Sequence, residues 1–444
     1  MVFSWLIAAC ETGAEPLDPT LEFDAARGTR AVVTWTTPEE ATGVLDYGPD
    51  DGYGTEVVAV ESEGGTAHTA VISGLGAGET VHWRVVSPAA SGTLRSEDAE
   101  FAAPLPPIAV PSFFDGLDAG AAPSAPFTLS SAVLAPRSSF ILDRLGRPVW
   151  WALPDEGRGS IQARLSADGA SVLMLETSDS MQDDLGQLVS VPLAEGDGWT
   201  LRTPLAHHDF VELPDGRFAY LALDIRPMGD AEVAGDSIVV MAPDGTAEVV
   251  WTSWGSLDED TIDPGAVFYG GLVDWIHANS LVYDEATDRY WVSCHNLSTV
   301  LVIDASTGEI EWQIGGWHTN VEVSGDPIAL QHEVFLVPGG FLLFNNRRAG
   351  PQDLYSEVIE YSFDEANATA EPVWSWQDPD GLYSAFLGGA ERLADGGTLV
   401  SWGAAGRLGE VGADGTVKLQ LDAGLGVALG YAHAITQLEA GEDR

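Results

Sequence analysis

The sequence predicts an all-β protein, a six-bladed β-propeller preceded by a small β-sandwich. A short segment recurs along the chain at intervals of 45 to 69 residues, which is the spacing of propeller blades or solenoid units. Strand-like runs separated by turn residues follow the copies, as expected of repeated hairpins. No long stretch of the chain shows helical periodicity, and no apolar run of about 18 residues is present to span a membrane as a helix.

Each copy of the repeat begins with one slot residue. An apolar residue follows the slot by five positions, and a turn begins at once. The slots are, in chain order, Ser160, which fits with a one-residue slip, and then His208, His277, His332, Gly388 and His433. Because equivalent positions in a repeat become equivalent positions in space, the histidines at the slots are expected to converge on one site.

The rest of each unit predicts three more strands. A second strand-like run follows the slot segment, and hairpins such as 239–251 and 300–312 place Asp-Gly or Thr-Gly between β-branched runs. Four strands per unit make a propeller blade. The last unit has only its first strand before the chain ends, while strands at 127–134 and 139–151 precede the first slot. We expect these early strands to complete the last blade, so that closure gives six blades and removes exposed sheet edges.

The residues before the repeats predict a separate domain. Runs at 31–37, 43–48, 68–75 and 80–86 alternate as short strands at sandwich spacing, and this stretch resembles a fibronectin type III domain. A proline-rich linker at 102–107 follows it. The expected organisation is a tether at 1–22, the sandwich at 23–104 and the propeller at 105–444.

The charge of the chain excludes some partners. The formal net charge is −49, and Lys418 is the one lysine. Such a surface repels nucleic acid and anionic membranes, so no nucleic-acid partner is expected. An anionic substrate would need a local positive site. No cofactor is expected, and the oligomeric state stays open.

The two cysteines exclude a disulfide framework and suggest different roles. The segment 6–10, Leu-Ile-Ala-Ala-Cys, resembles the cleavage box of bacterial lipoproteins. It predicts a lipid anchor on Cys10 and a location in the bacterial cell envelope. Cys294 stands in a strand beside His295 and is expected to be a small core residue rather than a reactive thiol.

The first strand of each blade lines the central channel, so the slot histidines should ring one mouth of it. Histidine there can act as nucleophile, acid, base or metal ligand. Asn279, two residues after His277, should point to the same side of its strand and could donate its amide to an anion. His207 should face the opposite way from its neighbour. His207, His433 and Arg347 are further candidates for substrate binding.

Several segments carry a family resemblance. They are His-Asp-Phe at 208–210, Asp-Trp-Ile-His-Ala-Asn-Ser at 274–280, Gly-Glu-Ile-Glu-Trp at 308–312, Gln-His at 331–332, and Ala-Glu-Arg-Leu-Ala-Asp-Gly-Gly-Thr-Leu-Val at 390–400. Together they resemble the bacterial arylsulfotransferase family from about residue 105 to the end.

The resemblance implies a six-bladed propeller that moves a sulfuryl group from a phenolic sulfate ester to a phenol acceptor, without a nucleotide sulfate donor. It places the nucleophile at His332 and assigns binding of the sulfate oxygens to His208, His277 and Asn279. The chemistry is consistent with these residues, because a neutral imidazole can attack sulfur while nearby donors stabilise the equatorial oxygens.

The chain departs from the family pattern at one position. The family carries arginine in a Ser-x-Arg element, whereas the string here is Ser-Cys-His at 293–295. Guanidinium and imidazole are not interchangeable at an oxyanion site. His295 could replace the arginine when protonated, or Arg347 and Arg348 could reach the site.

Two other functions stay open on the sequence. His208, His277 and His332 could hold a divalent metal ion in a metal-dependent enzyme, since three imidazoles suit zinc or another transition metal. The chain could also be a non-catalytic propeller that binds an envelope component, because one fold hosts many functions.

Overall fold

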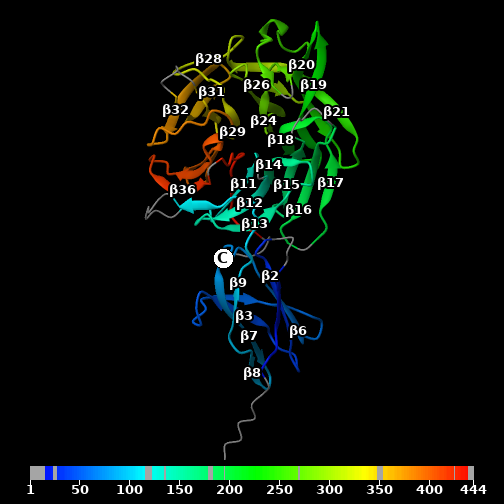
Figure 1. The fold of residues 1–444 in the computed structure, drawn as a ribbon, viewed down its shortest axis with the longest axis vertical. Helices are drawn as coiled ribbons and strands as arrows, with labels where there is room; N and C mark the ends of the chain where they lie inside the picture. Colours follow the sequence, from blue (N-terminus) through cyan, green and yellow to red (C-terminus); the bar gives the residue numbers. More distant parts are fainter. Residues whose placement is uncertain are drawn as a thin grey trace, which may run out of the picture. The chain divides into compact units, whose positions relative to one another are not determined.

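The computed structural model describes residues 16–23, 28–115, 123–134, 137–178, 184–194, 196–268, 271–347, 354–424 and 426–438. Its regular structure is β-strand, with short 3-10 helices such as η1 (Glu259–Thr261) and η3 (Gly403–Ala405). The all-β class expected from the sequence is therefore confirmed. No helix in these ranges is long and apolar enough to cross a membrane. The chain divides into two compact units, residues 1–105 and 106–444 (Figure 1).

The first unit consists of two sheets around one core. Strand β2 shows why, since Ala31, Val33 and Trp35 are buried while the residues between them are more exposed, the alternation of a sheet with one covered face. Residues of both sheets, among them Trp35 and Trp83, share one apolar cluster. One sheet has the order β1 (Thr20–Phe23), β2 (Ala31–Thr36), β6 (Ala67–Ile72), β5 (Val60–Glu61). The other has the order β4 (Thr55–Val58), β3 (Val44–Gly48), β7 (Thr80–Ala89), β8 (Gly92–Arg95), with β9 (Ala99–Ala102) also paired to β7.

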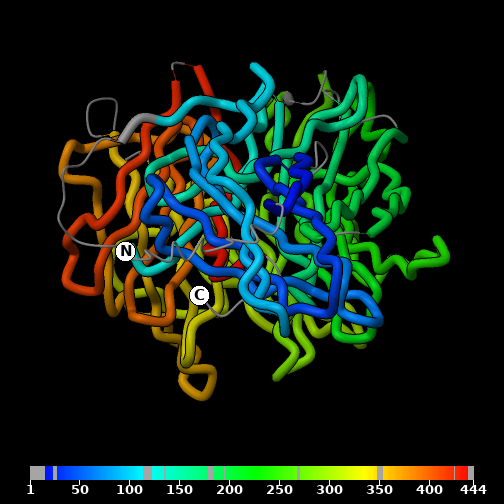
Figure 2. Tube along the Cα trace, turned by 90° about the horizontal axis from the view of Figure 1, so that it is seen from below, coloured from blue at the N-terminus to red at the C-terminus, as the bar shows by residue number. Residues whose placement is uncertain are grey.

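The described part of the second unit contains six sheets, and their chain colours follow one another around it in Figure 2. Three of them come from consecutive segments in the first half of the unit, except that the first also takes in β37 from the C-terminal end. The first contains β13 (Pro148–Ala152), β12 (Ser138–Asp143), β11 (Phe127–Ala132) and β37 (His433–Ile435). The second contains β14 (Gly159–Leu165), β15 (Ser171–Thr177), β16 (Gln187–Pro192) and β17 (Trp199–Arg202). The third contains β18 (Ala206–Glu212), β19 (Phe218–Met228), β20 (Ala231–Met241), β21 (Ala247–Thr252), β23 (Leu272–Asp274) and β22 (Val267–Phe268).

The other three sheets follow the same plan, with one strand added at the outer edge of two of them. The fourth contains β24 (Ala278–Asp284), β25 (Arg289–Cys294), β26 (Thr299–Asp304) and β27 (Ile310–Gly315). The fifth contains β29 (His332–Val337), β30 (Gly340–Asn345), β31 (Glu357–Asp364), β32 (Thr369–Gln377) and β28 (Glu322–Val323). The sixth contains β33 (Gly389–Arg392), β34 (Thr398–Trp402), β35 (Arg407–Val411), β36 (Val417–Ala423) and β10 (Phe113–Asp115).

The two ends of the second unit meet in one sheet, where β37 pairs with β11 (Figure 1). Leu129 lies opposite His433, and Phe127 lies opposite Ile435. Strand β10, earlier still in the chain, pairs with β36 of the sixth sheet. The expectation that early strands complete the last repeat is therefore confirmed.

The cores of the second unit lie between neighbouring sheets. One apolar cluster joins residues of the third and fourth sheets, including Trp251, Trp275 and Leu301. Another joins the fourth and fifth, including Trp291 and Phe341. Because each sheet has neighbours on both faces, inner strands such as β12 are buried along their whole length, and their sequences are near-continuous apolar or small-residue runs.

A buried ion pair ties three innermost strands together. Arg164 of β14 binds Asp209 of β18 through Nη2, 2.9 Å from each carboxylate oxygen. The same carboxylate accepts the backbone N–H of Leu281 of β24 at 2.8 Å. Asp209 has no exposed surface, so these donors take the place of water around its carboxylate. The pair fixes the strand that carries His208.

Candidate active site

The slot residues lie at the start of the innermost strands or directly before them. These strands are β14, β18, β24, β29, β33 and β37. From β14 to β33, each strand in this order contacts the next one. Pairing to the second strand shifts register close to the slot in β18, β24 and β29. A β-bulge of this kind bends a strand and redirects its side chains. The repeat therefore brings its slots to one end of the inner strands.

The backbone at the slots is unusual for histidine. His208 has φ 53° and His277 has φ 50°, while at the third slot the positive angle, 41°, falls on Glu333 instead of His332. Residues with side chains rarely adopt the left-handed region, and such strain concentrates at functional sites. At the fourth slot Gly388 has φ 110°, and a Cβ there would lie 2.6 Å from Cδ1 of Phe344. The glycine is thus required by space as well as by conformation.

Four histidines form a continuous row of rings. The centroids of His208 and His277 are 4.7 Å apart, those of His277 and His295 are 5.1 Å apart, and those of His295 and His332 are 5.2 Å apart. The convergence of the three slot histidines expected from the repeat is found, with His295 inserted between His277 and His332. The row runs from β18, through the residue before β24 and the residue after β25, to the start of β29.

His207 joins the row from its far end. Its Nδ1 lies 2.8 Å from Nδ1 of His208, so one ring donates a hydrogen bond to the other. Its Nε2 lies 2.9 Å from Oδ1 of Asp236, and both side chains are buried. Simple strand alternation would turn the two histidines apart, but the positive φ of His208 brings their rings together.

His277 is held by a carboxylate. Its Nδ1 lies 2.5 Å from Oδ2 of Asp274, three residues earlier in the chain. The backbone carbonyl of Asp274 accepts a bond from the Asn296 amide. A carboxylate on one imidazole nitrogen fixes the orientation of the ring.

His332 is buried, with 2% of its surface exposed. Its Nδ1 lies 2.7 Å from Oδ1 of Asn346. Its Nε2 accepts a hydrogen bond from the backbone N–H of Leu387 at 3.1 Å. Both ring nitrogens are therefore engaged, and their partners determine which nitrogen carries the proton.

Burial and the neighbouring imidazoles disfavour the charged form of three rings of the row. Burial, followed by the neighbouring imidazoles, lowers the pKa of His208 and of His332 well below 6.5. The same two causes, burial first and then His277, lower the pKa of His295 to about 4. At neutral pH these three rings thus carry lone pairs and no charge.

The remaining candidates are placed differently. The Asn279 amide is buried, and its Nδ2 donates at 2.8 Å to the carbonyl of Gln331, the residue before His332. Arg347 is bound to Asp326, and to Glu357 at 3.2 Å. His433 bonds Glu391 at 3.0 Å. The structure therefore adds neither Arg347 nor His433 to the row of rings.

Some expectations concern other parts of the chain. Cys294 is fully buried, and burial raises the pKa of its thiol well above 9, as expected of a core residue. Cys10 and Arg348 lie outside the described residues. In the ranges that the structure describes, no group of three or more His, Cys, Asp or Glu residues is arranged to hold a metal ion. The metal-dependent alternative therefore has no candidate centre there.

The sequence reasoning did not assign Asp274, Asp236 and Asn346, which hold three of the histidines. Asp274 belongs to the same segment as His277, and its spacing of three residues was a usable signal. Asp236 and Asn346 come from other strands or loops. Contacts of that kind depend on the fold and leave no local pattern.

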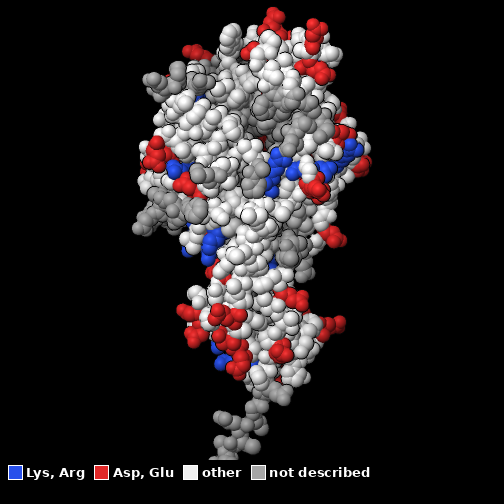
Figure 3. Space-filling model, in the orientation of Figure 1, with Lys and Arg blue, Asp and Glu red and all other residues white. Residues whose placement is uncertain are grey.

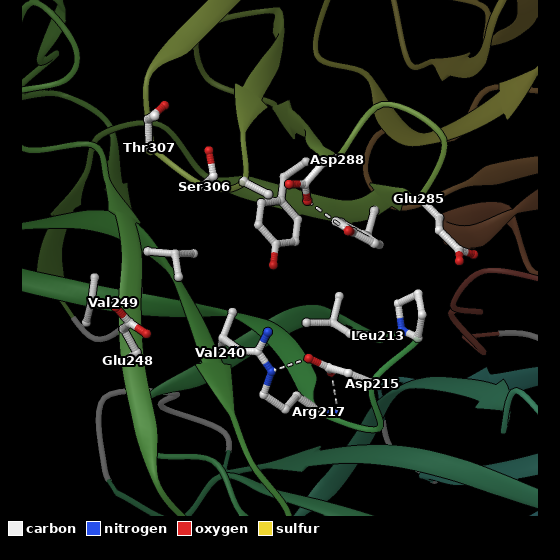
Figure 4. A pocket seen from close by; sticks show the side chains of 15 residues that line it. Leu213, Asp215, Arg217, Val240, Glu248, Val249, Glu285, Asp288, Ser306 and Thr307 are labelled. Carbon is white, nitrogen blue, oxygen red and sulfur yellow. Dashed lines mark hydrogen bonds and ion pairs between the residues drawn. The ribbon is translucent and has the colours of Figure 1, made fainter.

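A hollow of about 620 Å³ lies elsewhere, between turns of the third and fourth sheets (Figure 4). Its lining includes Asp215, Arg217, Tyr283 and Asp288 but no histidine. Arg217 is paired with Asp215, and the Tyr283 hydroxyl donates to Asp288. Arg217 and Asp288 are thus already engaged by neighbouring side chains of this hollow.

A family model described as arylsulfotransferase (ASST) matches residues 127–422. The chain belongs to the arylsulfotransferase family. The match begins at the first residue of β11 and includes every member of the histidine row. The residues that the structure brings together thus lie inside the family region.

Two curated relatives agree with this family. The arylsulfate sulfotransferase AssT of Lelliottia amnigena is 25% identical over 193 residues, 35% of this chain and 32% of the relative. The arylsulfate sulfotransferase AssT of Escherichia coli O6:H1 is 26% identical over 200 residues, 37% of this chain and 33% of the relative. The aligned part thus spans about a third of each relative's length.

Similar solved structures are more distant. A streptogramin B lyase structure has a TM-score of 0.41 at 12% identity and covers 70% of this chain and 87% of its own. Apo AztD from Citrobacter koseri has a TM-score of 0.29 at 14% identity and covers 69% and 97%. Likenesses of this size say nothing about the activity of the chain.

Proposed function

We propose that the chain is an aryl-sulfate sulfotransferase that moves a sulfuryl group from a phenolic sulfate ester to a phenol acceptor. The observation that carries the proposal is the row of imidazoles from His208 to His332, in which burial disfavours the charged form of His208, His295 and His332. Family membership supports sulfuryl transfer in general terms. The row supplies what such a transfer needs, a neutral nucleophile with further polar groups beside it.

The proposed nucleophile is His332. In the first half-reaction the lone pair of Nε2 attacks sulfur, the S–O bond to the aryl group breaks, and the aryl oxide leaves with the electron pair. In the second half-reaction the phenol oxygen attacks the same sulfur, the N–S bond breaks, and its electron pair returns to Nε2. The phenol proton is released to a base. We propose His277, held by Asp274 at 2.5 Å, as this base.

The other residues of the row and its surroundings are proposed to bind the substrate. His208, His277 and Asn279 would contact sulfuryl oxygens, with His207 behind His208. His295 stands between His277 and His332, where it would take the place of the family arginine. Because its pKa is about 4, it would be a neutral ring near neutral pH rather than a cation.

One observation keeps a second function in view. Arg347 is committed to Asp326 and Glu357, and His295 is neutral near pH 7, so neither brings a permanent positive charge to the row. A non-catalytic propeller that binds an envelope component would tolerate this loss. The chain would then bind an aryl sulfate without turning it over.

The architecture and location belong to the same proposal. We infer that the six sheets are the blades of one propeller at residues 105–444, supported by the pairing of β37 with β11. The two-sheet unit is proposed to be a fibronectin type III-like domain at residues 23–104, supported by its shared core. Residues 1–22 would be a tether lipidated at Cys10, which places the enzyme in the bacterial cell envelope.

Transfer from 4-nitrophenyl sulfate to phenol tests the activity. The wild-type chain should release 4-nitrophenol and form phenyl sulfate, and His332→Gln should lower kcat/KM by at least about 1000-fold, since it removes the nucleophile. His318→Gln is the matched control, because His318 is an exposed histidine 3.9 Å from Asp258. Equal rates for wild type and His332→Gln would rule out the mechanism. Binding of the ester without turnover by the wild-type chain would favour the non-catalytic module.

A further inference from the structure

Asn346 is a fully buried amide next to His332. Its Nδ2 donates to two backbone carbonyls, that of Ser384 at 2.9 Å and that of Leu387 at 2.7 Å. Both amide hydrogens are used in these bonds. The reversed orientation would place the amide oxygen against two carbonyl oxygens, so Oδ1 must face His332.

This orientation determines the tautomer of His332. Oδ1 of Asn346 has no hydrogen to give, so the imidazole donates from Nδ1 across the 2.7 Å contact. On the other side of the ring, the N–H of Leu387 donates to Nε2 at 3.1 Å. A nitrogen that accepts a hydrogen bond carries a lone pair, not a proton. Two separate bonds therefore give the same tautomer, with the proton on Nδ1 and the lone pair on Nε2.

We propose that Asn346 is the positioning residue that commits His332 to attack through Nε2, and that the Leu387 amide covers this nitrogen until a substrate arrives. The inference rests on the proposed sulfuryl transfer. When the N–S bond forms, Nε2 gives up its lone pair and the ring becomes cationic, retaining the proton on Nδ1. The bond to Asn346 Oδ1 then becomes a charge-assisted bond and stabilises the intermediate.

The Leu387 N–H must exchange its acceptor during this step. It loses the Nε2 lone pair and becomes available to an oxygen of the sulfuryl group now attached to that nitrogen. Leu387 has φ 57° and precedes Gly388 with φ 110°. Its carbonyl is held by Asn346 Nδ2. One side chain thus orients both the nucleophile and the backbone donor next to it.

The groups that face His332 define what a variant should change. His295, in the turn after β25, and His277, directly before β24, disfavour its charge, whereas Asn346 and the backbone of Leu330 favour it. In Asn346→Asp a carboxylate would replace the neutral acceptor and raise the pKa of His332. Since the neutral ring is the nucleophile, protonation would begin at a higher pH and remove activity there.

The test compares variants of two adjacent buried amides in the full chain. Asn346→Asp should move the acidic limb of the kcat/KM profile to higher pH, and Asn346→Leu should lower kcat/KM by about 10- to 100-fold, because it leaves a buried donor unpaired. Asn345 is the control. It is equally buried but bonds the backbone of Ala329 and Pro327 instead of a histidine. Asn345→Asp should leave the profile where it is in the wild type.

Nitrogen-15 NMR of histidine-labelled chain reads the tautomer without any turnover, with the His332 signals assigned by their loss in His332→Gln. The wild type should show a protonated Nδ1 and a bare Nε2 for His332. A proton on Nε2, or a pH profile that Asn346→Asp does not move, would overturn the inference. An inactive wild-type chain with the expected tautomer would instead refute the proposed transfer.

Discussion

Removing the carboxylate of Asp209 should destabilise the second unit strongly. The residue has no exposed surface and accepts from Arg164 through both oxygens, from Gln162 at 3.3 Å and from the N–H of Leu281 at 2.8 Å. Asp209→Ala leaves a partly buried guanidinium and a buried N–H without their acceptor. Breaking a buried pair from one side costs about 3–5 kcal/mol, so the free energy of unfolding should fall by that amount.

The assay is urea denaturation followed by tryptophan fluorescence, with Asp215→Ala as the control. Asp215 also pairs with an arginine, Arg217, but both side chains are about half exposed, and such pairs contribute less than about 1 kcal/mol. The midpoint should therefore drop clearly for Asp209→Ala and barely for Asp215→Ala. Equal midpoints for the two variants would show that burial does not govern the strength of these pairs.

Two further variants test the environment of the row. Burial raises the pKa of Glu333 well above 4.5, so the folded chain keeps a proton that the unfolded chain releases, and wild-type stability falls as pH rises. The glutamine of Glu333→Gln cannot ionise, so the Tm of this variant should rise relative to that of the wild type as pH increases from about 5 to about 8. A Tm difference that stays constant over this range would contradict the reasoning. Gly388→Ala should lower the free energy of unfolding by more than about 1 kcal/mol, because the added methyl group would clash with the Phe344 ring and alanine disfavours a positive φ. Gly339→Ala, with positive φ but open space, should cost less in the same urea assay; an equal loss would assign the effect to φ alone.

The repeat was the part of the fold that the sequence could predict well. Its slots predicted that His208, His277 and His332 converge, and the chain brings them into one row. The incomplete last repeat predicted pairing with the early strands, which β37 and β11 make. Both predictions succeed because a repeated sequence imposes a repeated local structure, and closure is the way to pair its two edges.

The details of the row could not be read in this way. Strand alternation placed His207 and His208 on opposite sides of the strand. A positive φ at His208 instead brings the Nδ1 atoms of the two rings to 2.8 Å from each other. Arg347 was a candidate cation for the site, yet Asp326 and Glu357 engage it. A bulge and a remote partner are set by packing and leave no periodic mark on the sequence.

The sequence by itself determined that histidines meet at the start of the inner strands, because position in a repeat is a local property carried by each copy. Only the tertiary structure decided which nitrogen of His332 holds the lone pair. That choice depends on Asn346 and on the Leu387 amide, which are 14 and 55 residues away along the chain. Hydrogen-bond partners so far apart are brought together by the packing of neighbouring sheets, and the direction of each bond then follows from which atoms can donate.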